Sequence, residues 1–200
     1  MKKAVIYVHG KGGNIEEAEH YNRFFDDEFE IIGFDYKSEN PWDAKIEFTN
    51  YFNSVFNRYS KIYLIANSIG VYFTMLSLTN KNIEKAFFIS PIVDMERLIL
   101  DMMKWANISE DELMEKKEIE TFFGEILSWE YLTYVRNNPI NWDIPTNILF
   151  ADKDNMTSVN TMRNFANKIN ANLTIMRNGE HWFHTDEQMD FLDNWFKKNI

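Results

Sequence analysis

The apolar residues of the chain fall into two kinds of pattern, and the first is a set of six short, continuous runs. These runs are rich in Val, Ile, Leu and Phe, and turn-forming residues such as Gly, Pro, Asn, Asp or Ser follow each of them closely. Short apolar runs bounded in this way are typical of buried β-strands. The predicted strands are residues 4–8, 30–34, 61–66, 85–89, 147–151 and 172–176.

The second pattern is helical, since the segments between these runs place apolar residues at steps of three and four. Asn14 suits an N-cap, and Pro41 suits the first turn of a helix. Thr185 and Gln188 form a capping box before the last helical segment. Strands that alternate with helices form a parallel sheet, because each parallel pair needs a crossover. The pattern therefore predicts an α/β fold: a mostly parallel sheet of about six strands with helices on both faces.

One stretch, residues 92–144, breaks this alternation. We find no strand pattern in it, and Ser109 with Glu112 has the spacing of a capping box. Apolar residues there step by three, four and three at Met95, Leu98, Met102 and Trp105. The stretch therefore predicts a helical insertion that lies over one edge of the sheet, within a single domain spanning residues 1–200.

Composition restricts the partners of this domain. Of its 200 residues 45% are hydrophobic, enough to bury a substantial core. The formal net charge of −10 disfavours nucleic acid and anionic membrane surfaces as partners. The absence of cysteine excludes disulfides, thiolate metal sites and a Cys nucleophile. No apolar run reaches the roughly 20 residues of a membrane span, and the run after Lys2 and Lys3 is too short for a signal peptide. We therefore expect a cytoplasmic protein whose partners are neither nucleic acids nor membranes.

Candidate chemistry begins where the third predicted strand meets a helix, at the sequence Ala-Asn-Ser-Ile-Gly. In these residues, 66–70, small side chains stand two positions before and two positions after Ser68. A sharp strand-to-helix turn needs small residues at both places, and it presents the serine hydroxyl above the sheet. The N–H of Ile69, at the helix N-terminus, is then able to donate to a developing oxyanion. The alternative is that Ser68 only caps the helix.

A glycine-rich loop, His-Gly-Lys-Gly-Gly at residues 9–13, follows the first predicted strand. Its glycines allow the backbone to approach a substrate oxygen closely, so the N–H of Lys11 or Gly12 is the candidate second oxyanion donor. The spacing matches neither G-x-G-x-x-G nor the P-loop pattern, which argues against a phosphate-binding loop. We interpret His9 as a brace for the loop rather than as a base.

A serine nucleophile needs a general base, and two histidines follow the last predicted strand. His181 and His184 both fall at the carboxyl edge of the sheet, where Ser68 also lies. We predict His181 as the base, because it follows the strand closely and stands two residues after Gly179. His184 directly precedes the cap residue Thr185 and is interpreted as a helix-start residue.

The base needs an acid that fixes its tautomer. Asp-Lys-Asp at residues 152–154 follows the fifth predicted strand and so lies on the same edge. Asp154 is the predicted acid, since Asp152 abuts the strand and suits a turn. Asp94, after the fourth strand, is the reserve, although its position also suits a helix N-cap.

Together these motifs resemble those of the α/β-hydrolase superfamily, in which serine, acid and histidine occur in this order along the chain. The resemblance extends over nearly the whole chain, from residues 9–13 through Ser68 and Asp154 to His181. Ala66 departs from the first glycine of the family's G-x-S-x-G motif, a substitution that many members tolerate. The resemblance implies the α/β-hydrolase fold without its usual two initial antiparallel strands, and acyl transfer through an acyl-enzyme with no cofactor.

Members of this superfamily carry a lid or cap where the insertion occurs in this chain. The insertion is rich in aromatic and Met residues, which suit an apolar acyl or aryl pocket, although they also suit simple packing onto the sheet. The candidate pocket residues are Trp105, Trp129 and Trp182. We expect the substrate to be a small ester or thioester.

Three other functions stay open. The same serine, histidine and aspartate would serve an amidase or a peptidase. A hydrolase-like scaffold is also able to bind a ligand without catalysis, since a fold does not fix a function. A metal hydrolase is the third alternative, because His181, His184 and Asp186 are close in sequence. No H-E-x-x-H motif or comparable ligand set accompanies them, so we predict no metal site.

Overall fold

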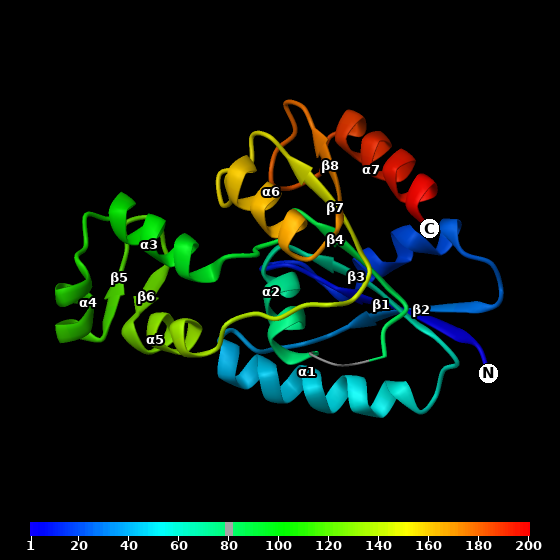
Figure 1. The fold of residues 1–200 in the computed structure, drawn as a ribbon, viewed down its shortest axis with the longest axis horizontal. Helices are drawn as coiled ribbons and strands as arrows, with labels where there is room; N and C mark the ends of the chain where they lie inside the picture. The colour runs from blue at the N-terminus through cyan, green and yellow to red at the C-terminus, as the bar shows by residue number, and fades with distance from the viewer. Residues whose placement is uncertain (79–81) are drawn as a thin grey trace.

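A computed structural model describes residues 1–78 and 82–200 (Figure 1). Its centre is a six-stranded sheet in the order β2-β1-β3-β4-β7-β8, in which all neighbouring pairs are parallel. The strands are β1 (Lys3–Val8), β2 (Phe29–Phe34), β3 (Ile62–Asn67), β4 (Lys85–Ile89), β7 (Thr146–Ala151) and β8 (Asn172–Met176). Each coincides with one predicted run to within one residue at either end, so the predicted sheet is confirmed.

The strand order brings the glycine-rich loop beside the elbow. The chain passes from β1 to the edge strand β2 and returns across β1 to β3, so the order reverses beside β1. Val8 pairs with Ala66, and the carboxyl ends of β1 and β3 therefore lie next to each other. Ligands of open parallel sheets bind beyond the strand ends at such a reversal.

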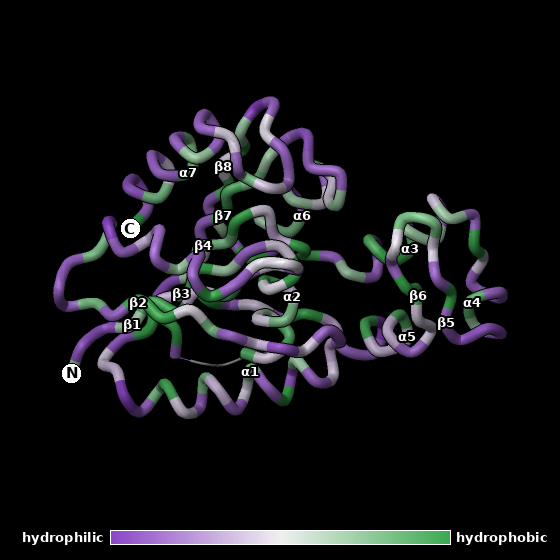
Figure 2. Tube along the Cα trace, turned by 180° about the vertical axis from the view of Figure 1, so that it is seen from behind, coloured by the Kyte–Doolittle hydropathy of each residue, from purple (hydrophilic) through white to green (hydrophobic). Residues whose placement is uncertain are grey.

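Alternate side chains of each strand pack against different helices. In β1, Ala4, Ile6 and Val8 belong to one core, whereas Val5 and Tyr7 belong to the other. The first core includes α1 (Pro41–Phe56), α2 (Ser68–Ser77) and α6 (Val159–Lys168), and the second includes η1 (Ile15–Phe24) and α7 (Asp186–Asn199). Burial on both faces explains why the strands are continuously apolar in sequence. Figure 2 shows hydrophobic stretches at the centre and hydrophilic ones on the outer helices.

The helix ends follow the predicted caps. Asn14 caps η1, a 3₁₀ helix, through a capping box, and Pro41 is the first residue of α1. Thr185 and Gln188 form the reciprocal capping box of α7. In the part of the chain that the structure describes, no helix combines the length and the apolar character of a membrane span.

Within residues 92–144, residues 95–137 form a lobe beyond the carboxyl end of the sheet, and the chain after them runs back along the sheet to β7 (Figure 1). The lobe contains α3 (Met95–Trp105), α4 (Glu110–Lys116), β5 (Glu118–Glu120), β6 (Ile126–Ser128) and α5 (Trp129–Asn137). The expectation of a purely helical insertion is therefore wrong, because β5 and β6 pair as an antiparallel hairpin. Each of these strands has three residues, too few to show the alternation that identifies a strand in sequence.

Candidate active site

Ser68 stands at the junction between β3 and α2, as the elbow motif predicts. β3 ends at Asn67 and α2 begins at Ser68, whose φ is 50°. A side chain in this left-handed region costs about 1–2 kcal/mol, and such strain is concentrated at functional sites. The small neighbours are needed, because Ala66 is fully buried and a Cβ on Gly70 would lie 2.3 Å from the carbonyl oxygen of His9.

The glycine-rich loop passes next to Ser68. A Cβ on Gly10 would lie 3.0 Å from the Cβ of Ser68, so a side chain there would crowd the serine. Gly12 has a φ of 75°, which favours glycine. In the part of the chain that the structure describes, the N–H groups of Lys11 and Gly12 donate to no other group. The predicted oxyanion donors on Lys11, Gly12 and Ile69 thus belong to the two segments that meet at Ser68.

His9 braces this loop, as the sequence indicated. Its ring stacks on Tyr36 with the centroids 4.3 Å apart, and its Nδ1 lies 2.8 Å from the carbonyl oxygen of Gly10. The Tyr36 hydroxyl donates to the carbonyl oxygen of His9 at 3.0 Å. These contacts hold both the ring and the backbone of His9 in place.

Ser68, His181 and Asp154 come together from three strand ends. The Ser68 Oγ lies 2.8 Å from the His181 Nε2, and the His181 Nδ1 lies 2.6 Å from the Oδ2 of Asp154. The Asp154 side chain has no exposed area, whereas 21% of the His181 side chain is exposed. An ionised carboxylate only accepts hydrogen bonds, so Nδ1 carries the proton and Nε2 accepts from the Ser68 hydroxyl. This is the geometry of a nucleophile, a base and the group that orients the base.

Asp154 is held by its own loop, which is bonded to the loop that carries His181. The Oδ1 of Asp154 accepts from the N–H groups of Met156 and Thr157 at 2.7 and 3.1 Å. The N–H of Lys153 donates to the carbonyl oxygen of Gly179 at 3.0 Å, which joins the loop after β7 to the loop after β8. A carboxylate bound at both oxygens has little freedom to rotate, and it therefore fixes the imidazole plane.

The alternative candidates for the acid and the base make other contacts in the structure. Asp152 lies in the turn after β7, as expected, and accepts from the N–H of Asn178 in the loop after β8 at 2.6 Å. Asp94 caps α3. His184 stacks on Trp182 with the ring centroids 4.6 Å apart, and its Nδ1 lies 2.7 Å from the carbonyl oxygen of Trp182. Across the described residues, no group of three His, Asp or Glu side chains is arranged to hold a metal ion.

A network behind the elbow was not apparent from the sequence. The Asn67 Nδ2 donates to the Tyr7 hydroxyl at 2.6 Å, and Tyr7 in turn donates to Glu17. The other oxygen of Glu17 accepts from the N–H of Asn14 at 3.3 Å. Burial raises the pKa of the Tyr7 phenol, which keeps it a neutral donor. The residue before Ser68 is thus linked to the end of the glycine-rich loop through partners 60 positions apart.

One ion pair joins the insertion to the glycine-rich loop. The Nζ of Lys11 lies 2.7 and 2.6 Å from the two carboxylate oxygens of Glu125, in the turn between β5 and β6. The hairpin is therefore held beside the loop that flanks Ser68.

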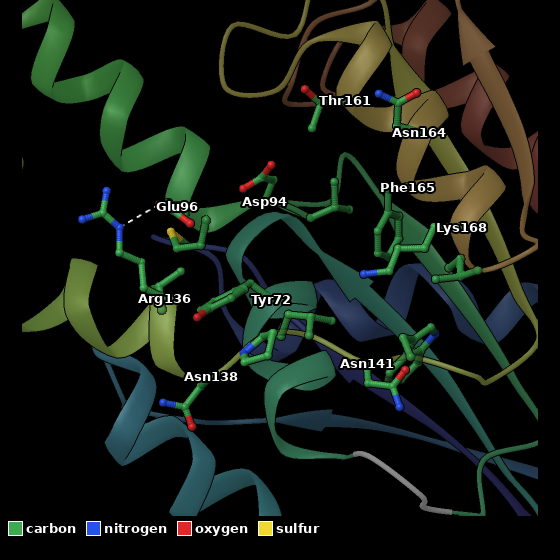
Figure 3. A pocket seen from close by; sticks show the side chains of 17 residues that line it. Tyr72, Asp94, Glu96, Arg136, Asn138, Asn141, Thr161, Asn164, Phe165 and Lys168 are labelled. Carbon is green, nitrogen blue, oxygen red and sulfur yellow. Dashed lines mark hydrogen bonds and ion pairs between the residues drawn. The ribbon is translucent and has the colours of Figure 1, made fainter.

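A cavity of about 440 Å³ lies between the insertion and α6 (Figure 3). The first turn of α3, the end of α5, residues 138–142 and one face of α6 line it, together with Tyr72 of α2. None of the expected pocket residues Trp105, Trp129 and Trp182 contributes to it. Trp105 and Trp182 are exposed by 49% and 73%, and Trp129 packs against the core. The cavity lining mixes polar and apolar side chains and was not predicted.

Comparison with known proteins shows the same fold. No family model and no curated protein matches the chain. Among solved structures, Est1E from Butyrivibrio proteoclasticus has a TM-score of 0.74 and 16% identity, over 98% of this chain and 86% of its own. Alpha/beta hydrolase domain-containing protein 10 from mouse has a TM-score of 0.71 and 14% identity, over 98% and 90%. A lipase-esterase related protein from Clostridium acetobutylicum has a TM-score of 0.64 and 17% identity, over 99% and 94%. The chain therefore has the α/β-hydrolase fold, as its motifs implied.

Proposed function

We propose that the protein is a serine hydrolase in which Ser68 is the nucleophile, His181 the general base and Asp154 the acid that orients the histidine. The observation that carries this proposal is the row of hydrogen bonds from the Ser68 Oγ through the imidazole to a fully buried carboxylate. The left-handed backbone at Ser68 supports it, because such strain persists where a function needs it.

The reaction begins when the His181 Nε2 takes the hydroxyl proton as the Ser68 Oγ attacks the substrate carbonyl carbon. The carbonyl π electrons move to the oxygen, and Asp154 stabilises the imidazolium. Breakage of the bond to the leaving group restores the carbonyl, and the imidazolium gives its proton to the departing alcohol or thiol. Water then attacks the acyl-enzyme with the same base, and the free acid leaves.

The oxyanion of each tetrahedral intermediate needs preorganised donors. The N–H of Ile69 in the first turn of α2 is one, and the N–H of Lys11 or Gly12 is the other. The close approach of the glycine-rich loop to Ser68 supports this assignment, since both segments flank the position where the oxygen would develop.

We infer that the substrate is a small carboxylic ester or thioester. Solved structures of similar fold include Est1E with bound ferulic acid and an esterase from Pyrococcus furiosus. These names support the substrate class, and the order of steps above applies equally to an oxygen or a sulfur leaving group.

Turnover of p-nitrophenyl acetate and butyrate by the wild type and by Ser68→Ala tests the proposal. Ser90→Ala is the matched control, because Ser90 also follows a strand with a positive φ of 44°, is buried, and has an Oγ without a partner among the described residues. We expect Ser68→Ala to lose about 10⁴-fold or more in kcat and Ser90→Ala to retain it. Ester turnover that survives Ser68→Ala in folded, pure protein contradicts the proposal.

The bond type needs its own measurement, since the same groups are able to cleave an amide. The p-nitroanilide of each acid is assayed beside the p-nitrophenyl ester. A higher kcat/KM for the anilide, after allowance for the intrinsic reactivity of the two bonds, would assign an amidase in place of an esterase.

A further inference from the structure

Two phenol hydroxyls near the elbow are buried without a hydrogen-bond partner. Tyr72 of α2 is 1% exposed and Tyr131 of α5 is partly buried. Neither hydroxyl has a partner in the part of the chain that the structure describes. A buried donor left unpaired costs about 1–3 kcal/mol, and such groups in native proteins are usually explained by a function or a ligand.

The two hydroxyls lie in the same region of the molecule, near the cavity described above. Tyr72 lines this cavity, and Figure 3 shows its hydroxyl directed toward α5. Val135 of α5 lines the cavity as well, and Tyr131 lies four residues before it, on the same helix face. Burial raises the pKa of Tyr131, and the neighbouring phenols of Tyr72 and Tyr36 raise it further. Both groups are therefore neutral donors that lie near each other.

This region begins one helical turn from Ser68. Tyr72 follows Ser68 by four residues on α2, about 6 Å along the helix axis. The N–H of Ile92 donates to the carbonyl oxygen of Ser68 at 3.1 Å, and the next residue, Val93, lines the cavity. The cavity lining thus includes one residue a helical turn after Ser68 and another next to a residue bonded to the Ser68 backbone.

The remaining lining carries balanced charge, since Asp94 and Glu96 are matched by Arg136 and Lys168. Glu96 is paired with Arg136 at 2.7 Å, so these two charges compensate each other. Asn138, Asn141 and Asn164 add amide side chains to a lining that is otherwise about half apolar. An alkyl chain in this region would keep the phenol donors unpaired, whereas a keto or hydroxyl oxygen would accept from them.

We propose that Tyr72 and Tyr131 determine substrate specificity, and that the preferred acyl group carries a neutral hydrogen-bond acceptor a few atoms from the scissile carbonyl. This inference rests on the proposed function of Ser68. It adds two hydrogen-bond donors to the expected apolar pocket, and it makes simple alkyl esters poor substrates relative to their oxo analogues.

Two matched pairs of esters test the inference: p-nitrophenyl pentanoate with 4-oxopentanoate, and p-nitrophenyl hexanoate with 5-oxohexanoate. The members of each pair share leaving group and chain length, so the ratio of their kcat/KM values reports recognition of the keto oxygen, once their hydroxide-catalysed rates are divided out. We expect the wild type to favour at least one oxo ester by about tenfold or more. Tyr72→Phe and Tyr131→Phe should reduce that ratio toward one.

Tyr63→Phe is the control variant. Tyr63 is partly buried in β3 near the amino end of the sheet, where its ring packs on Phe29 at 5.5 Å. We expect Tyr63→Phe to keep the wild-type ratio and the wild-type rates on all four esters. Melting temperatures and circular dichroism spectra like those of the wild type show that the Tyr72→Phe and Tyr131→Phe variants fold.

The possible failures are distinguishable. A wild type that hydrolyses both members of each pair equally, or a ratio that neither Tyr72→Phe nor Tyr131→Phe changes, overturns the specificity inference and leaves the function of Ser68 intact. Failure of folded wild type to hydrolyse any of the four esters in a Ser68-dependent way overturns both.

Discussion

Lys11 and Glu125 lie 114 positions apart, yet the Lys11 Nζ is within 2.7 Å of both carboxylate oxygens of Glu125. The pair connects the loop beside Ser68 to the hairpin of the insertion. The Lys11 side chain is 70% exposed and that of Glu125 is 38% exposed, so water and salt weaken their attraction. The insertion is therefore held near the site by an interaction that responds to ionic strength.

A double-mutant cycle with Lys11→Met and Glu125→Gln should give a coupling energy of about 0.5 kcal/mol at low salt and near zero at about 1 M salt. Urea unfolding measures it. We also expect the two single variants to lower ester kcat/KM at low salt, because they free the glycine-rich loop. The Glu112–Lys116 pair of α4 is the control, and its removal should leave kcat/KM unchanged. A large coupling that salt does not reduce would contradict the proposed role of this pair.

Asp154→Asn should preserve the fold and abolish most of the activity. Its Oδ1 still accepts from Met156 and Thr157, but its amide nitrogen cannot accept from the His181 Nδ1, which forces the wrong tautomer. We expect kcat to fall about 10⁴-fold, with little change in the melting temperature. Asp152→Asn is the matched control and should stay active, since Asp152 bonds the N–H of Asn178 and not His181, and asparagine keeps the accepting oxygen. Equal losses of activity in the two variants would argue against Asp154 as the acid.

Ser68→Gly should be more stable than Ser68→Ala, although both are inactive. Each variant loses the same hydroxyl, but only glycine adopts a φ of 50° without strain. The relief of backbone strain exceeds the free-energy cost of the extra entropy that glycine gives the unfolded chain. We therefore expect the unfolding free energy of Ser68→Gly to be roughly 0.5–1 kcal/mol higher than that of Ser68→Ala. The difference in urea unfolding free energy measures it. An alanine variant of equal or greater stability would show that the elbow is not strained.

Gly70→Ala should destabilise the protein far more than Gly124→Ala. The new Cβ at position 70 would meet the His9 carbonyl oxygen at 2.3 Å, and backbone on both sides would have to move. At position 124 nothing lies within 4 Å, and only the φ of 84° is unfavourable. By urea unfolding, we expect Gly70→Ala to lower the free energy of unfolding by about 3 kcal/mol or more and Gly124→Ala to lower it by about 1 kcal/mol. Similar losses of stability in the two variants would contradict the tight packing of α2 on the glycine-rich loop.

The sheet was predictable because every strand has a strong local signal. Helices cover both faces, so the strands are continuously apolar, and the turn-forming residues that follow mark their carboxyl ends. The β5–β6 hairpin has no such signal. Its three-residue strands depend on a turn in which the Thr121 hydroxyl donates to the Glu125 carbonyl at 2.8 Å, and on the pairing of Glu125 with Lys11.

The candidate site likewise has residues that the sequence predicts and residues that it does not. Ser68, Asp154 and His181 were recognisable because each stands at a strand end, and parallel strands gather their ends at one edge. The cavity and its phenols were not, because the approach of α5 to α2 is set by how the insertion packs. The tryptophan prediction followed composition alone, whereas exposure depends on which way each side chain points, as the 73% exposed Trp182 illustrates.

Covalent labelling with a fluorophosphonate probe, followed by intact mass and peptide mapping, tests the activation of Ser68 most directly. We predict one adduct per chain, on Ser68, which His181→Ala abolishes and His184→Ala retains. An unlabelled Ser68 in folded wild-type protein, or labelling that persists in His181→Ala, would contradict the proposed serine hydrolase.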